Sequence, residues 1–293
     1  MNFPRRRWLV TIFVTLPFLL GIHPNSASAQ ELTTAATPDT VQSDLSDSNT
    51  SQQQGAGQQA ADPQSTAPPT RDVSILKLPR NIFQDETKIA FFPKSLAQGK
   101  HWWPTIGILG GTAALIASDP YTAPAFHNTG RFHEYNRDLS AISTGTFIAA
   151  VPAAIYGVGL ITKNSYAKDT ALLAGEAVVD GFLLDLPFKA ISARKQPINY
   201  SGPGPYSDSF FHGSHNPAGS GGFYSMHAFA AAAVATVIAQ RYGKHRWVPI
   251  VAYGLAGAIC FSRISRSDHF PSDVFFGGAM GIVIARFAVV PAR

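Results

Sequence analysis

Long apolar stretches alternate with short polar ones from about residue 102 to the end of the chain. Inside the stretches there is no period-two alternation, and alanine is abundant, which favours helices over strands. The predicted helices are Trp102–Ser118, Ile142–Ile161, Thr170–Ser192, Met226–Gln240, Trp247–Phe261 and Asp273–Val290. Small residues recur four apart at Gly107 and Gly111, and again at Gly277, Gly281 and Ala285, a spacing that lets helices pack closely. The pattern predicts an all-α bundle of about six helices.

The lengths of these stretches fit either a soluble protein or a membrane protein. Only Ile142–Ile161 reaches the roughly 20 residues of a membrane span without a charge. Thr170–Ser192 carries Glu176, Asp180 and Asp185, which are costly in lipid. A tightly packed soluble bundle and a set of short, tilted spans both fit this pattern.

The N-terminal part of the chain has a different character. Three arginines, Arg5–Arg7, precede the apolar run Trp8–Ile22, and Ala27–Ala29 resembles a cleavage site. We expect a signal peptide over residues 1–29, with an uncut membrane anchor as the alternative, and export to the periplasm or cell envelope. Residues 30–71 are rich in Gln, Ser, Thr and Pro and are predicted to be a disordered linker. A helical domain is expected over residues 72–293, with a motif core at 140–291.

Charge and cysteine content narrow the function. Of the net charge of +5 on 293 residues, residues 1–29 carry +3, residues 30–70 carry −5 and the rest carries +7. A positive folded region with few charges suggests an anionic partner, such as a phosphate group or a lipid surface. The basic residues form no dense stripe with interleaved aromatics, so nucleic acid is not expected. The single cysteine, Cys260, excludes an intramolecular disulfide framework and a multi-cysteine zinc site.

Three polar motifs lie at predicted helix ends. The first, Ser262–Asp273, contains Arg263, His269 and Asp273. If the backbone there is helical, the Asp273 carboxylate can hold one nitrogen of the His269 ring and leave the other free as a nucleophile or base. A metal site or a simple surface pair could use the same spacing.

The other two motifs add a phosphate cradle. Ser225 is a good N-cap for the helix that carries His227 in its first turn, and a helix N-terminus suits a phosphate oxygen. Lys189 and Arg263 can supply the positive charge that a phosphoryl group needs. Together the motifs indicate a two-histidine phosphoryl-transfer site built from helix ends. His212 and His215, in a loop rich in Gly, Ser and Pro, are interpreted as solvated loop residues.

These motifs resemble the signature of the type 2 phosphatidic acid phosphatase (PAP2) superfamily, which includes bacterial nonspecific acid phosphatases and vanadium haloperoxidases. The signature is K-x6-R-P, P-S-G-H and S-R-x5-H-x3-D, and its third part matches in full from Ser262 to Asp273. The second part keeps its Ser and His but has Tyr224 and Met226 for Pro and Gly. The first part keeps Lys189 and Pro197, but Gln196 replaces the arginine.

The resemblance implies a role for each matching residue. His269 would attack phosphorus and form a phosphohistidine, Asp273 would orient it, and His227 would act as general acid and then base. The phosphoryl oxygens would be held by Lys189, Ser225, Arg263 and backbone N–H groups such as that of Met226. Gln196 can donate only an uncharged hydrogen bond, which could cost about 2–4 kcal/mol of transition-state stabilisation. Arg194, two positions earlier, would face elsewhere on a regular helix.

The resemblance also sets expectations for cofactors and partners. It implies an exported, metal-independent phosphatase with no cofactor, acting on a phosphorylated lipid or a small phosphomonoester. A vanadate-dependent haloperoxidase is one alternative. The other is a weakened relative that binds phosphate head groups or serves as an envelope scaffold. A membrane surface is a further candidate partner, and no protein partner is predicted.

Topology bears on the membrane question. In six-span lipid phosphatases of this superfamily the site faces outside and the N-terminus inside. A signal peptide here would put residues 30–100 outside, so six spans would bring the motifs into the cytoplasm. The sequence thus favours an exported domain that is not a six-span protein, while peripheral and five-span forms stay open.

Overall fold

The computed structural model describes residues 71–127, 129–141, 144–202, 204–216 and 222–290. The predicted signal peptide and residues 30–70 of the predicted linker lie outside the described residues. Within the described part the chain is helical, without strands, so the predicted all-α fold is confirmed. Its α-helices are α2 (Leu78–Ala90), α3 (Phe92–Ala97), α4 (Trp102–Thr122), α5 (His133–Ala141), α6 (Thr144–Ile161), α7 (Ser165–Ser192), α8 (Met226–Arg241), α9 (Trp247–Ser265) and α10 (Pro271–Ile284).

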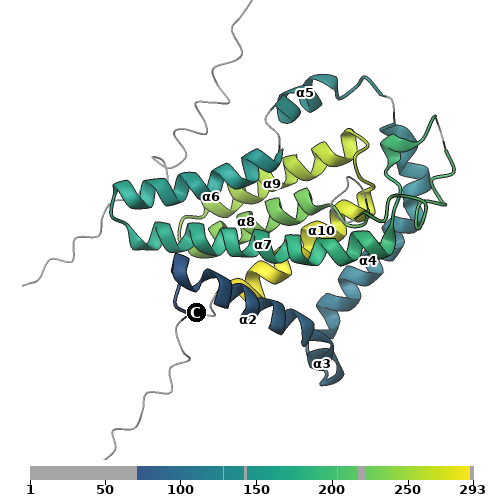
Figure 1. Ribbon diagram of the computed structural model, residues 1–293. Coiled ribbons are helices and arrows are strands. Elements are labelled where there is room, and N and C mark those ends of the chain that lie inside the picture. Colours follow the sequence, from purple (N-terminus) through teal and green to yellow (C-terminus); the bar gives the residue numbers. More distant parts are fainter. Residues whose placement is uncertain (1–70, 128, 142–143, 203, 217–221, 291–293) are drawn as a thin grey trace, which may run out of the picture. The chain divides into compact units, whose positions relative to one another are not determined.

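Each of the six predicted apolar helices is present, as α4, α6, α7, α8, α9 and α10 (Figure 1). Short helical turns join some of them: η3 (Ala123–Ala125) follows α4 and η4 (Pro197–Asn199) follows α7. The π-helical segment η5 (Ala285–Val289) continues α10. The prediction of about six helices omits α2, α3 and α5, because these helices are short or rich in polar residues and lack a long apolar run.

Helix α8 forms the centre of the core. It contacts α6, α7, α9 and α10, and nearly all of its residues from Ala228 to Ala239 are buried. Its alanines let neighbouring helices approach closely. The predicted small-residue contacts are present on α10, where an added Cβ would lie 2.5 Å from Ser225 O at Gly277 and 2.2 Å from Phe229 O at Gly281. The first contact fixes the start of α8 against the start of α10.

Within the described residues, three helical segments are long and apolar enough to cross a membrane: α6, α9 and the combined α10–η5 segment Pro271–Val289. The sequence pattern identified only α6 as long enough. The other two segments were missed because each helical segment extends beyond the uninterrupted apolar stretch from which it was predicted. Large apolar side chains on these segments are exposed, among them Ile250, Phe275 and Phe287. The helices therefore support an association of the chain with membrane.

Candidate active site

Four helix ends from distant parts of the sequence meet at one place: the ends of α7 and α9 and the beginnings of α8 and α10. The Ser225 N–H donates to Asp273 O (3.1 Å), which joins α8 to α10. The Phe223 N–H donates to Ser192 Oγ (3.0 Å), which joins the approach to α8 with the end of α7. Gly222 has a positive φ, and a Cβ there would lie 2.8 Å from Lys189 Cγ, so only glycine fits beside this lysine.

His269 and Asp273 are paired, but not as successive turns of one helix. His269 precedes α10, and Asp273 is the third residue within it. Asp273 Oδ2 accepts the Phe270 N–H (3.0 Å) and lies 3.5 Å from His269 Nδ1. The expected helical spacing is therefore wrong in its local geometry, because Pro271 begins the helix two residues after the histidine. The carboxylate still faces Nδ1, which leaves Nε2 as the ring nitrogen for chemistry.

Arg194 lies within the site rather than away from it. Helix α7 ends at Ser192, and Ala193 adopts a left-handed conformation (φ 37°) that turns the next residue inward. The Arg194 guanidinium donates to Asp273 Oδ1, and to Asp119 Oδ2 at 2.7 Å. The expectation that Arg194 faces elsewhere assumed a continuing helix. With two carboxylates as partners, its charge is balanced, so it does not replace the arginine missing at position 196.

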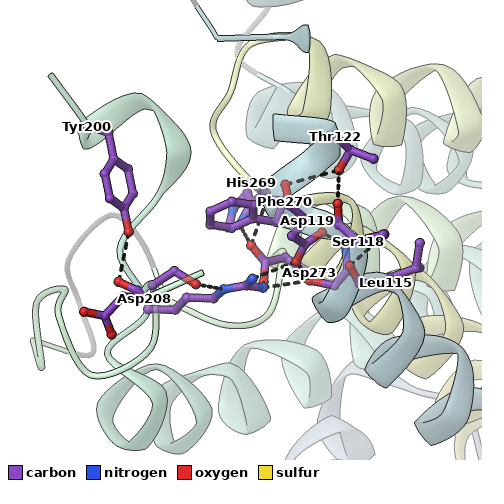
Figure 2. Close-up of polar contacts among 12 residues, drawn as sticks. Leu115, Ser118, Asp119, Thr122, Tyr200, Asp208, His269, Phe270 and Asp273 are labelled. Atoms are coloured by element: carbon purple, nitrogen blue, oxygen red, sulfur yellow. Dashed lines mark hydrogen bonds and ion pairs between the residues drawn. The ribbon is translucent and has the colours of Figure 1, made fainter. Parts of the chain in front are cut away.

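Asp119 is a site residue that the sequence motifs did not reveal. It lies near the end of α4, is fully buried, and accepts hydrogen bonds from the Ser272 N–H (3.3 Å) and the Ser272 hydroxyl. Figure 2 shows Asp119 beside Asp273 and His269, with α4 supplying it from the side. The one signal available in the sequence was the position of Asp119, a single carboxylate at the end of an apolar stretch and directly before Pro120.

The predicted N-cap, Ser225, is fully buried, and its hydroxyl has no hydrogen-bond partner among the residues whose structure is described. Its side chain does not cap α8, although the Phe229 N–H donates to Ser225 O (3.0 Å) and begins the helix. Met226, the first residue of α8, packs its side chain against the core. The unpartnered hydroxyl and the first N–H groups of α8 together can hold an oxyanion.

Tyr224 occupies the place of the signature proline. Its ring is buried against Phe188, Phe229 and Phe276, and its hydroxyl donates to Gly181 O (3.0 Å). Tyr224 thus fills the core next to Ser225, and its own hydroxyl is bonded to the backbone of α7.

Lys189 and Arg263 each pair with a carboxylate, whereas Gln196, at the position of the signature arginine, contacts a neighbouring amide. Lys189 Nζ lies 2.8 Å from Asp185 Oδ2, in the last turns of α7. Arg263 is buried, contacts Ser262 Oγ at 3.1 Å, and its Nη1 lies 3.3 Å from Asp268 Oδ2. Gln196 accepts a long hydrogen bond from Asn199 Nδ2 (3.5 Å), and no contact joins it to the other site residues within the described chain.

His227 is buried beside positively charged groups. Burial, and after it the nearby charges of Arg263, His269 and Lys189, together lower the pKa of His227 to about 4. The imidazole is therefore neutral near pH 7 in the free protein. A bound phosphate dianion would oppose these charges and raise the His227 pKa, so the ring can take up a proton when substrate is present.

The two loop histidines follow the sequence interpretation. His212 and His215 are exposed in the loop, where their Nδ1 atoms contact backbone oxygens of Phe210 and Ala190. Among the residues whose structure is described, no group of three or more His, Cys, Asp or Glu side chains is placed to hold a metal ion.

A pair of histidines, a lysine, an arginine and a hydroxyl thus lie around one helix N-terminus. Residues 170–291 match the family model of the PAP2 superfamily, so this part of the chain is similar to that superfamily, and the resemblance found in the motifs is confirmed. The matched segment contains all three motifs but not Asp119. Comparisons with curated proteins and with solved structures gave no match. The match to this superfamily supports phosphatase-type activity in general.

Proposed function

We propose that this protein is a phosphatase that hydrolyses a phosphate ester through a phosphohistidine on His269. The observation that carries the proposal is the meeting of the His269–Asp273 pair with the unpartnered Ser225 hydroxyl at the start of α8. The second support is the positive charge of Arg263 and Lys189 near His227, which adds to burial in lowering the pKa of this histidine and would stabilise a bound phosphoryl group.

The reaction would proceed in two displacements. In the first, the Nε2 lone pair of His269 forms a bond to phosphorus, the ester P–O bond breaks, and His227 gives its proton to the leaving oxygen. In the second, His227 takes a proton from water, the water oxygen bonds to phosphorus, and the N–P bond breaks. Asp273 Oδ2 lies 3.5 Å from Nδ1 without a hydrogen bond in the free protein, and it would close on the ring and form that bond as positive charge develops.

The phosphoryl oxygens would be held by the protein alone. Lys189 and Arg263 supply positive charge, and Ser225 Oγ and the N–H groups of Met226 and His227 supply hydrogen bonds. With cations and donors of this kind around the phosphate, we propose that no metal or cofactor takes part. Each cation also pairs with a carboxylate, Asp185 or Asp268, which fixes its position before substrate binds.

The substrate we propose is a phosphorylated lipid or a small phosphomonoester, met on the outer side of the cytoplasmic membrane. The apolar helices α6 and α9 and the segment Pro271–Val289 support a position at a membrane. Export rests on the arginines and apolar run of residues 1–29.

Phosphate release by the exported chain, with a chelator present, tests this function. An aryl phosphate and a micellar lipid phosphate are offered to the wild type, to His269→Ala and to His212→Ala. We expect release that persists in the chelator, is lost in His269→Ala and is unchanged in His212→Ala, whose ring is exposed in the loop. Full activity of His269→Ala would refute the proposal, and loss of activity in the chelator would refute its metal independence.

A weakened relative that binds phosphate groups is the second candidate, favoured by Gln196, which is directed to Asn199 instead of the other site residues. Binding of inorganic phosphate without turnover by the wild type would support it. Gln196→Arg would then be expected to restore release, because an arginine here adds the charge that the motif lacks.

A further inference from the structure

A cavity of about 500 Å³ lies beside the active site and is used by none of the steps above. Three segments enclose it: the chain between α4 and α5 with part of α5, the turn η4, and the end of α9 with the loop after it. The described lining includes two arginines, Arg137 and Arg266, and two histidines, His127 and His133, but no carboxylate. The lining also includes the apolar Phe126 and Ile198, and Arg137 pairs with Glu134, which is not part of the lining. Cations and hydroxyls in a wall without an acid suit an anion.

The cavity shares a wall with the active site. Asp268 Oδ2 lies 3.3 Å from Nη1 of Arg263, in the active site, and 3.1 Å from Nε of Arg266, in the cavity lining. One carboxylate thus holds both arginines. The charge of Arg266 also acts on His227, where it lowers the pKa. An anion in the cavity is therefore close enough to belong to the same ligand as a phosphate at His269.

Hydrogen bonds between the segments that line the cavity hold them in place in the free protein. Asn136 on α5 donates to Ser265 O (3.1 Å) and accepts from Ser265 Oγ (2.6 Å), which joins α5 to the end of α9. The Ile198 N–H donates to Ser267 O (2.9 Å), which joins η4 to the same loop. The cavity is pre-formed, so binding would cost little ordering entropy.

One polar side chain in the lining lacks partners. Both ring nitrogens of His127 are buried without a hydrogen bond, while the ring packs edge-on against Tyr206 with centroids 6.0 Å apart. A buried imidazole without partners is unfavourable unless something else bonds to it. A phosphate oxygen in the cavity would supply that bond.

We infer that this cavity binds a second phosphate group of the substrate whose first phosphate is cleaved at His269. The inference rests on the proposed function, and it defines a substrate class: a molecule with two phosphate groups on one scaffold. The arginine and histidine side chains hold the second group by charge-assisted hydrogen bonds, and only the first group meets the nucleophile. The segments from α4 to α5 that complete the cavity lie outside the residues that match the PAP2 family model, so they would give this chain its own preference.

A series of soluble substrates tests the inference. Alkanediol bisphosphates of increasing chain length are compared with the matching alkyl monophosphates, and phosphate release gives kcat/KM for each. We expect one chain length to exceed its monophosphate by about ten- to hundredfold, the value of a charge-assisted contact, mainly through a lower KM. The variant His133→Gln/Arg137→Gln should lose most of this preference and keep wild-type activity on monophosphates. Arg131→Gln removes an exposed arginine of the same segment that does not line the cavity, and it should keep the preference.

The outcomes separate the inference from the proposed function. Turnover of monophosphates with no preference for any bisphosphate overturns the inference and leaves the function intact. If inorganic phosphate alone alters monophosphate turnover, and the double variant removes that effect without any bisphosphate preference, the cavity binds free phosphate and the inference is wrong. If nothing is turned over, the proposed function fails. Calorimetry with the same ligands then decides the inference, which requires tighter binding of a bisphosphate to the wild type than to the double variant.

Discussion

Replacement of Asp119 by asparagine should damage both the fold and the reaction. The Asp119 carboxylate is fully buried and shares Arg194 with Asp273, whose other oxygen faces His269 Nδ1. The amide of the Asp119→Asn variant would keep the shape of the side chain but not its charge, so Arg194 would depend on Asp273 alone. The stronger attraction would draw the Asp273 carboxylate towards Arg194 and weaken its hold on the histidine.

The structure sets the size of both effects. Removing one partner of a buried ion pair costs about 3–5 kcal/mol, and the lower end applies here because Asp273 still balances Arg194. We expect the free energy of unfolding to fall by about 3 kcal/mol. A catalytic group displaced by about 1 Å loses about a hundredfold in rate, so kcat should fall by about ten- to hundredfold with KM nearly unchanged.

Urea unfolding and phosphate release from an aryl phosphate measure the two effects separately, with activity assayed where the variant is folded. Asp208→Asn is the matched control, since its carboxylate is exposed and pairs only with the exposed His212 ring. The control should match the wild type in both measurements. Loss of stability with an unchanged kcat would refute the positioning role, because Asp119 would then only hold α4 in place.

Three further predictions concern single groups. Ser225→Ala should lower kcat/KM by about tenfold or more and leave the free energy of unfolding nearly unchanged in urea, because the hydroxyl has no partner within the fold. Arg266→Gln removes a charge that lowers the pKa of His227, so the falling limb of the kcat/KM–pH profile should move to higher pH. Asp180 is buried without a hydrogen bond, and burial raises its pKa to about 8 from 3.8. The folded state then holds a proton that the unfolded chain loses above 3.8, and stability falls as the pH rises towards 8. Asp180→Asn should remove this dependence and be more stable at pH 8 by roughly 2–5 kcal/mol in urea unfolding.

The apolar pattern predicted the helices that have long apolar faces and missed those that do not. α4, α6, α8, α9 and α10 follow from long apolar runs rich in Ala, Val, Ile and Gly, and α7 follows from an apolar run interrupted by Glu176, Asp180 and Asp185. The sequence of α5 resembles a polar connection, yet Asn136 joins this helix to Ser265 in the wall of the cavity beside the active site. Such a helix is fixed by tertiary hydrogen bonds, which leave no periodic signal in the sequence.

The site could be predicted where its residues are close in sequence. The pairing of His269 with Asp273 followed from their spacing, although the geometry comes from a helix start. The contact between Arg194 and Asp119 joins positions far apart on the chain and depends on the left-handed Ala193, a conformation that an alanine does not signal. For the same reason, Ser225 has the sequence pattern of a cap, whereas in the fold its hydroxyl is left unpartnered.

Trapping the phosphorylated protein tests the central claim most directly. The wild type is mixed with an aryl phosphate, quenched in base within the first turnover, and digested for mass spectrometry, with His269→Ala and His212→Ala treated alongside. We predict an acid-labile, base-stable phosphate on the peptide that carries His269 in the wild type and in His212→Ala, and none in His269→Ala. Continued phosphate release with no phosphate on that peptide, or with phosphate on a different residue, would contradict the account.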